Sequence, residues 1–157
     1  MTSKTETSEG LVAEYVTAMI GGQLFGLPIS RVQDVFMPDR LTRVPLSTAE
    51  NAGVLNLRGR IVTVIDMRAR LGLPKASDGK PPMAVGVDMR GESYGLLIDQ
   101  IGEVLRLAED SREENPVNLD PRMAKLAGGV HRLDGHLMVV LDVDRVLELA
   151  SKTQAAA

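Results

Sequence analysis

Several residue types that often mark function are scarce or missing in this 157-residue chain. It has no cysteine and no tryptophan, and only two each of phenylalanine, tyrosine and histidine. The lack of cysteine excludes disulfides, thiolate metal sites and a cysteine nucleophile. So few aromatic side chains argue against a surface that stacks nucleobases. The net charge of −3 also lacks the basic footprint of a nucleic-acid-binding protein.

Long hydrophobic segments are missing as well. The longest apolar run, Leu137–Leu141, has five residues, far fewer than a membrane span needs. The polar residues 2–10 do not resemble a signal peptide. We therefore expect a cytoplasmic protein without direct membrane insertion. A chain of this length suits one domain, or two small subdomains that share a core.

What the chain does contain is an internal repeat. Residues 25–35 read FGLPISRVQDV and residues 94–104 read YGLLIDQIGEV, so that Gly26 corresponds to Gly95 at an offset of 69. A second pair of segments matches at an offset of 76, with Gly53 corresponding to Gly129. Self-similarity in a fixed order indicates two related halves of about 70 residues. The extra residues between the two motifs of the second half are expected in a surface loop.

Each half is predicted to contain two β-hairpins. Apolar stretches of β-forming residues flank short glycine turns, which predicts strands at 15–20, 23–27, 54–57, 61–65, 83–89, 93–98, 130–133 and 137–141. Ser30–Phe36 fits either a short helix or a strand, and Pro38 ends it. The pattern predicts a mainly β fold of two small, mostly antiparallel barrels that pack on each other, with short flanking helices.

Domain boundaries follow from composition. The polar stretch Lys75–Pro82 holds one glycine and two prolines and is the expected linker. It separates subdomain halves of roughly 12–75 and 82–150. We expect the ends of the chain, residues 1–11 and 151–157, to be disordered tails.

Asp66 and Asp142 occupy equivalent places in the two halves, each directly after an apolar strand. A short carboxylate there can accept the free amides of a first helical turn. One helical turn would follow Asp66, with Gly72 as its C-cap. The two aspartates could instead be paired carboxylates for acid–base chemistry, but their equivalence favours two N-caps.

No catalytic or metal-binding set assembles along the chain. His131 and His136 flank the Asp134-Gly135 turn, but catalytic zinc usually needs three protein ligands and no third histidine exists. We interpret both as polar residues at a hairpin tip. The acidic stretch 109–114 is interrupted by Arg112 and lacks EF-hand spacing, so we expect a solvated loop. The sequence predicts no enzyme, no metal and no cofactor.

Arg58 is the residue that a purely structural interpretation explains least well. It stands at the hairpin turn where the second half has Asp134. Aspartate tolerates left-handed backbone and bonds to its neighbours, whereas arginine has no comparable local reason. We expect a type I turn with Gly59 left-handed, which would leave Arg58 unstrained and pointing outward. It is either an ordinary turn residue or a rigid five-donor fork for a carboxylate on a partner protein.

The segment VLNLRGRIVTVIDMR, residues 54–68, closely resembles the most recognisable segment of the CheW family, the bacterial chemotaxis coupling proteins. The repeated motifs at 26–35 and 94–104 fit the same family. Two departures are Asp34, where the family usually has Glu, and Thr63, where Pro is frequent. The resemblance covers roughly residues 12–150. It implies two SH3-like five-stranded barrels around a shared hydrophobic core.

The resemblance also implies a function. CheW proteins are non-enzymatic adaptors that link the cytoplasmic tips of methyl-accepting chemotaxis receptors to the histidine kinase CheA, in arrays at the membrane. Because the domain fills the chain, we expect a stand-alone adaptor. One alternative is a CheW-like adaptor of a pathway that controls pili or development. A distant alternative is a small-molecule-binding β-barrel protein, which would need a deep polar pocket.

Site residues are carried over by the same resemblance. The receptor tip helix would lie along a groove between the barrels, and the matching positions are Val32, Gly53, Arg58, Ile101 and Val104. The regulatory domain of CheA would contact barrel surfaces, for which the matching positions are Asp34, Met83 and Ala84. For Val32, Ile101 and Val104, plain core packing is the alternative.

Overall fold

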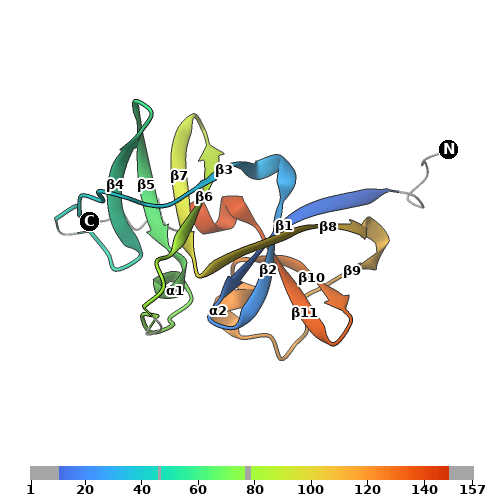
Figure 1. Cartoon of the computed structure of the whole chain (residues 1–157). Coiled ribbons are helices and arrows are strands. Elements are labelled where there is room, and N and C mark those ends of the chain that lie inside the picture. The colour runs from blue at the N-terminus through green and yellow to red at the C-terminus, as the bar shows by residue number, and fades with distance from the viewer. Residues whose placement is uncertain (1–10, 46, 77–78, 149–157) are drawn as a thin grey trace.

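The computed structural model describes residues 11–45, 47–76 and 79–148. The predicted tails lie outside these residues, apart from Leu11. Within the described chain, strands β1–β11 form two sheets that curl into two barrels side by side (Figure 1). The predicted fold class, two SH3-like barrels with short helices, is confirmed.

Barrel 1 is the five-stranded sheet. Its strand order is β3-β6-β7-β5-β4, and a bridge between Thr42 and Val54 brings the chain after β3 back to β4. The strands are β3 (Val32–Phe36), β4 (Asn51–Leu57), β5 (Arg60–Asp66), β6 (Met83–Met89) and β7 (Glu92–Ile98).

Barrel 2 is the six-stranded sheet, in the order β8-β1-β2-β11-β10-β9. Its sixth strand, β9, has two residues and follows β8 after a one-turn 3₁₀ helix, η2 (Glu109–Ser111). The strands are β1 (Val12–Ile20), β2 (Gln23–Pro28), β8 (Gln100–Ala108), β9 (Arg112–Glu113), β10 (Ala127–Leu133) and β11 (His136–Leu141).

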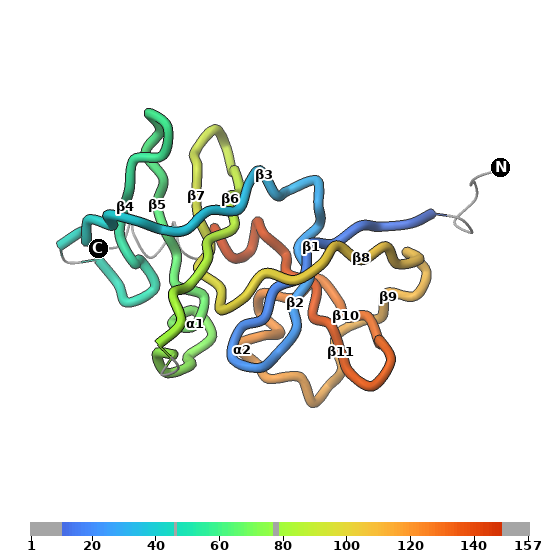
Figure 2. The backbone as a smooth tube through the Cα atoms, viewed as in Figure 1, coloured from blue at the N-terminus to red at the C-terminus, as the bar shows by residue number. Residues whose placement is uncertain are grey.

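The two barrels do not follow the two halves of the sequence, because each half places its first hairpin in the other barrel. The β1–β2 hairpin joins β11 and β8 of the second half, and the β6–β7 hairpin joins β5 and β3 of the first half. The chain changes sheets at η1 (Ile29–Arg31) and again at Asp99, the one residue between β7 and β8. Figure 2 shows both crossings. The exchange gives each barrel one parallel pair, β5–β7 and β2–β11.

One large core serves both barrels. Its buried residues come from the strands of both sheets and from the helix at 143–148, which lies between the barrels in Figure 1 (red). Val143, Val146 and Leu147 of that helix are 0–2% exposed. Smaller clusters fill each barrel, around Leu55 and Val64 in barrel 1 and around Met138 in barrel 2. The barrels are therefore packed through a common apolar layer.

Both predicted N-caps are confirmed. Asp66 Oδ1 accepts the Ala69 amide at 3.3 Å, ahead of helix α1 (Met67–Arg70). Asp142 Oδ1 accepts the Arg145 amide at 3.2 Å, ahead of the helix at 143–148. Gly72 has the left-handed φ of 71° that suits a residue after a helix. A further single-turn helix, α2 (Pro121–Ala124), was not predicted, although Asp120 caps it and Pro121 opens it.

The expected conformation of the Arg58 turn is wrong. Arg58 has φ 53° and Gly59 has φ 84°, so both central residues are left-handed, as in a type I′ turn. A two-residue hairpin favours this turn because its twist matches that of the flanking strands. Arg90-Gly91 repeats the geometry with φ 52° and 79°.

Candidate functional site

Arg58 and Asp34, which the family resemblance assigned to different partners, contact each other. Arg58 lies at the turn between β4 and β5, and its Nη1 is 3.5 Å from Asp34 Oδ2 on β3. The Arg58 side chain is 76% exposed and that of Asp34 is 23% exposed. A Cβ at Gly86 would overlap Asp34 Oδ1, so this glycine makes room for the carboxylate. The contact is long and involves one nitrogen of an exposed guanidinium, so the other donors of Arg58 face solvent.

The predicted kinase-contact residues lie on adjacent strands. Asp34 pairs with Gly86 across β3 and β6, and Phe36 pairs with Ala84. Ala84 is fully buried, whereas Met83 is half-buried. The Ala84 side chain therefore belongs to the core, and Asp34 and Met83 are the members of this set that solvent reaches.

The predicted receptor-contact residues divide between core and surface. Val32 on β3 and Ile101 on β8 are repeat equivalents, and both pack half-buried against the shared core. Val104 is 47% exposed. Gly53 is buried with φ 137°, and a Cβ there would lie 2.6 Å from the Thr42 carbonyl oxygen. Gly53 thus allows the close approach that shuts barrel 1, and is not a contact surface by itself.

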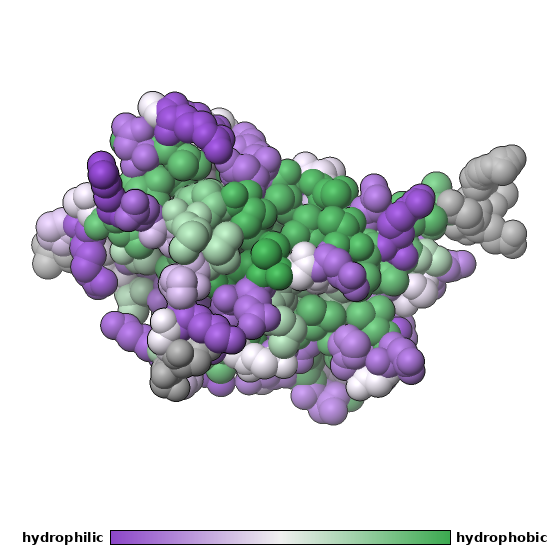
Figure 3. All heavy atoms as spheres, viewed as in Figure 1, coloured by the Kyte–Doolittle hydropathy of each residue, from purple (hydrophilic) through white to green (hydrophobic). Residues whose placement is uncertain are grey.

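Two exposed apolar residues beside this set were missed from the sequence. Val35 on β3 is 39% exposed and Ile29 on η1 is 40% exposed. Val35 is the repeat equivalent of Val104 at the offset of 69, so the repeat itself could have identified it. Figure 3 shows apolar residues gathered across the middle of this face, where β3 and β8 lie in Figure 1. We call Ile29, Val32, Val35, Ile101 and Val104 the junction surface.

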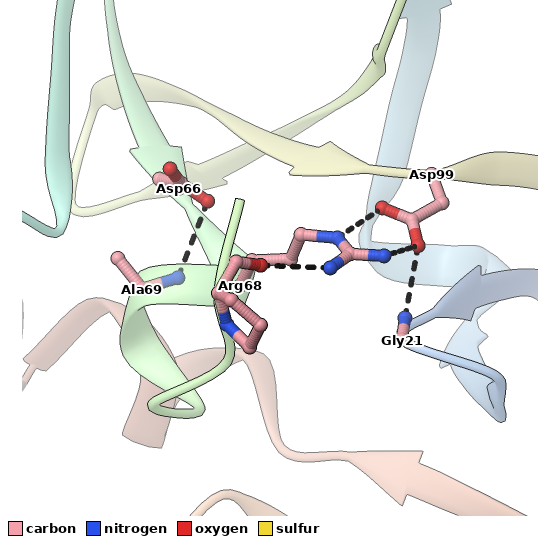
Figure 4. Close-up of polar contacts among 6 residues, drawn as sticks. Gly21, Asp66, Arg68, Ala69 and Asp99 are labelled. Atoms are coloured by element: carbon pink, nitrogen blue, oxygen red, sulfur yellow. Dashed lines mark hydrogen bonds and ion pairs between the residues drawn. The ribbon is translucent and has the colours of Figure 1, made fainter. Parts of the chain in front are cut away.

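Two ion pairs bridge the barrels at this junction. Arg68 of α1 donates to both carboxylate oxygens of Asp99 at 2.9 and 2.7 Å, and the Gly21 amide donates to the same carboxylate at 2.9 Å (Figure 4). The hydrogen bonds from Arg68 hold the pKa of Asp99 below its ordinary value. At the repeat-related position, Arg31 Nη2 lies 2.8 Å from Asp144 Oδ1. The pairs fix the relative placement of the strands that carry the junction surface.

The interpretation of both histidines as hairpin-tip residues is wrong for His131. His136 is exposed beside the turn, but His131 is 1% exposed inside barrel 2. Its Nδ1 lies 3.1 Å from Ser111 Oγ, and its Nε2 lies 3.3 Å from the Tyr15 hydroxyl. Burial lowers the pKa of the imidazole, and the nearby positive charge of Arg112 acts in the same direction. Val130 beside it is buried as well, so both faces of β10 are covered at this point of the strand.

The described residues offer neither a metal site nor a pocket of free catalytic groups. They contain no cluster of three or more histidine, aspartate or glutamate residues that could hold a metal ion. A pocket of about 230 Å³ beside α1 includes Asp66, Arg68 and Asp99, but these groups already serve as a helix cap and an ion pair. None of the described helices is long and apolar enough to cross a membrane.

Comparison with known proteins gives a consistent result. A family model described as "CheW-like domain" matches residues 14–151. The chain is 27% identical to chemotaxis protein CheW of Helicobacter pylori over 93% of this chain and 87% of that protein. It is 26% identical to protein PilI of Pseudomonas aeruginosa over 72% of this chain and 64% of that protein. The crystal structure of scaffolding protein TtCheW from Thermoanaerobacter tengcongensis superposes with a TM-score of 0.76 at 26% identity, covering 84% of this chain and 90% of that one.

Proposed function

The chain belongs to the CheW-like domain family, and on that premise we propose that it is a non-enzymatic adaptor coupling methyl-accepting chemotaxis receptors to the histidine kinase CheA. The junction surface is the single observation that carries this proposal. It exposes aliphatic side chains of η1, β3 and β8 where the barrels meet. An amphipathic helix, such as a receptor tip would present, binds a surface of this kind through its apolar face.

Arg58 supplies the polar element of the proposed receptor site. Its contact with Asp34 is 3.5 Å long and its own side chain is 76% exposed, and ion pairs of a solvated arginine contribute at most about 1 kcal/mol. Arg58 can therefore leave Asp34 at little cost and bind a receptor carboxylate with two hydrogen bonds. Asp34 and Met83, on the neighbouring face of β3 and β6, are then left to bind the kinase. In this arrangement the chain works in the cytoplasm, recruited to receptor arrays.

The experiment is a pair of titrations with partners from the same organism. The purified chain is mixed with the regulatory domain of CheA and, separately, with a receptor-tip fragment, and fluorescence anisotropy is recorded. Saturable binding to both, near micromolar or tighter, supports the proposal, since arrays add avidity to weak single contacts. Binding to neither partner would reject it.

A pathway other than flagellar chemotaxis is the second candidate. The similarity to PilI over 72% of this chain is the observation that favours it. The same fold and junction surface would then serve a different kinase and receptor. Titration with the regulatory domain of each CheA-type kinase in the genome separates the two candidates, because the cognate kinase binds most tightly.

A further inference from the structure

The two halves of the repeat carry opposite net charges. Residues 12–75 contain eight lysines or arginines and five aspartates or glutamates, which gives +3 with histidine neutral. Residues 82–150 contain seven lysines or arginines and thirteen aspartates or glutamates, which gives −6. Oppositely charged surfaces attract each other, and surfaces of like charge repel. The charges therefore favour contact between unlike halves.

The opposite charges meet at two contacts between the halves. Arg68 of the first half donates to both carboxylate oxygens of Asp99 in the second half, at 2.9 and 2.7 Å. Arg31 Nη2 of the first half lies 2.8 Å from Asp144 Oδ1 of the second half. In both contacts the cation belongs to the first half and the anion to the second.

The repeat relates these two contacts to each other. Arg68 and Asp144 correspond at the offset of 76, and each is the second residue of its helix. Arg31 corresponds at the offset of 69 to Gln100, the neighbour of Asp99, and both contacts use a residue from the point where the chain changes sheets. Each half thus has one charge on its helix and one at its crossing, and the two have the same sign.

Like charges would meet if a half paired with its own kind. Each half has hairpin edges and a core face that the other half covers, and the repeat gives a second copy of either half a similar pattern. In a pair of first halves, Arg31 of one copy would face Arg68 of the other. In a pair of second halves, Asp99 would face Asp144. Misassembly between similar units is a characteristic failure of repeat proteins, and like charges placed at the contact disfavour it.

These charges are partly withdrawn from solvent. The side chains of Arg68 and Asp99 are 22% and 24% exposed, and that of Arg31 is 30% exposed. Partial burial reduces screening, so that a like charge at the same place would be repelled more strongly. A third ion pair between the halves, Glu14–Arg106, has the opposite polarity, but it is 3.8 Å long and its side chains are 46% and 72% exposed. The two shorter contacts therefore dominate the selection.

We propose that two arginines of the first half, Arg31 and Arg68, and two aspartates of the second, Asp99 and Asp144, are specificity determinants that make unlike halves pair. They prevent a second copy of this chain from supplying the wrong half while the barrels assemble. The inference goes beyond the adaptor role proposed above, because it concerns the pairing of the repeats and uses no residue of the junction surface.

The test refolds the full chain from urea at high protein concentration and measures the dimer fraction by size-exclusion chromatography with light scattering. Arg31→Asp/Asp144→Arg keeps the net charge and an ion pair at each contact, but it gives each half one cation and one anion, so that like halves become complementary. We expect its dimer fraction to exceed that of the wild type about fivefold. The control is Glu14→Arg/Arg106→Glu, which also reverses one ion pair between the halves but adds to the separation of charge. Its dimer fraction should not rise.

Salt supplies a second measurement, which needs no substitution. Raising NaCl in the refolding buffer from about 0.01 M to about 1 M shortens the Debye length from about 30 Å to about 3 Å. The dimer fraction of the wild type should rise, because screening removes the repulsion between like halves. A salt-independent dimer fraction would overturn the proposal if circular dichroism shows that Arg31→Asp/Asp144→Arg does not refold.

If that variant does refold, its dimer fraction decides. A value equal to that of the wild type at low salt, or an increase of the same size in the control, would overturn the proposal. Exchange of unlike halves between copies would form dimers in all three proteins alike, so the comparison with the control removes it. None of these results depends on the titrations with CheA and receptor.

Discussion

Arg58 and Arg90 allow the role of one side chain to be separated from the role of its turn. Each is the first central residue of a left-handed Arg-Gly turn in barrel 1. Their side chains are 76% and 78% exposed, and each makes one long ion pair, at 3.5 and 3.9 Å. Only Arg58 lies beside Asp34 and the predicted receptor contacts. A difference between matched substitutions at the two sites therefore reports on partner binding.

Arg58→Glu should weaken receptor binding by about 2 kcal/mol or more, as expected for an arginine at the centre of an interface. The reversed charge repels the partner carboxylate and also Asp34. Arg90→Glu should leave receptor affinity unchanged, and circular dichroism should show both variants folded. The measurement is the Kd for the receptor-tip fragment. Wild-type affinity in Arg58→Glu would make Arg58 an ordinary turn residue.

Glycine substitutions at the same positions test the strain directly. Arg58→Gly and Arg90→Gly should each raise the free energy of unfolding by about 0.5–1 kcal/mol, because glycine relieves the left-handed backbone. Only Arg58→Gly should also lose receptor affinity. Urea denaturation and the receptor titration measure the two effects. Unchanged or lower stability in both variants would contradict the strain argument.

His131 predicts a dependence of stability on pH. Its folded-state pKa lies below the ordinary value because the ring is buried, so the unfolded chain binds a proton more readily. Stability should therefore be complete above the unfolded pKa of about 6.5 and fall as the pH drops below it. His131→Gln should have a smaller loss of urea midpoint between about pH 7.5 and pH 5.5. His136→Gln, at the exposed histidine, should keep the wild-type loss, and the same loss in His131→Gln would refute the assignment.

The N-caps should stabilise their helices without contributing to partner binding. Asp66→Ala removes the acceptor of the Ala69 amide and should lower the free energy of unfolding by about 1 kcal/mol. Its effect on CheA and receptor affinity should be small. Asp134→Ala at the exposed hairpin turn is the control and should cost less. Thermal or urea unfolding measures the stability of both variants. An Asp66→Ala variant as stable as the wild type would refute the capping role of Asp66.

Local elements were predictable because their signals are local. Glycine turns between apolar runs placed the hairpins, and a carboxylate after a strand placed both caps. The burial of His131 was missed because alternation along β10 gives no signal for it: Val130 and His131 are neighbours and both are buried. The type I′ turn at Arg58 was missed because residue preference opposes it, and strand twist decides the turn type instead. The open choice at Ser30–Phe36 resolves as a 3₁₀ turn followed by a strand.

The exchange of hairpins could not be predicted from the sequence, because it depends on which sheet each hairpin joins. The repeat predicts two similar sets of strands, and both arrangements, exchanged or not, satisfy the same local pattern. For the candidate site, the resemblance placed Arg58 and Asp34, but their contact arises only when the β4–β5 turn meets β3. The junction surface likewise needs β3 and β8, from opposite halves, to lie where the barrels meet.

The exchange has a consequence for the molecule as a whole. Because β1 and β2 pair with β8 and β11, and β6 and β7 pair with β3 and β5, neither half of the sequence contains a complete barrel. The shared core draws on both halves. The ion pairs Arg68–Asp99 and Arg31–Asp144 also join one half to the other. The chain should therefore fold as one cooperative unit, although its sequence is a repeat.

Cutting the chain within the 75–82 connection tests this cooperativity. Each fragment exposes hairpin edges and a core face that the other fragment would cover, so each alone should give a poorly dispersed ¹H–¹⁵N spectrum. Mixed in equal amounts, they should recover the dispersed spectrum of the intact chain and bind the receptor-tip fragment, because every strand pairing is restored. A chain cut at the exposed 90–91 turn is the control, since that cut separates β6 from β7 within one barrel. A folded spectrum from either isolated half would show that the repeats are independent domains and that the exchange is dispensable.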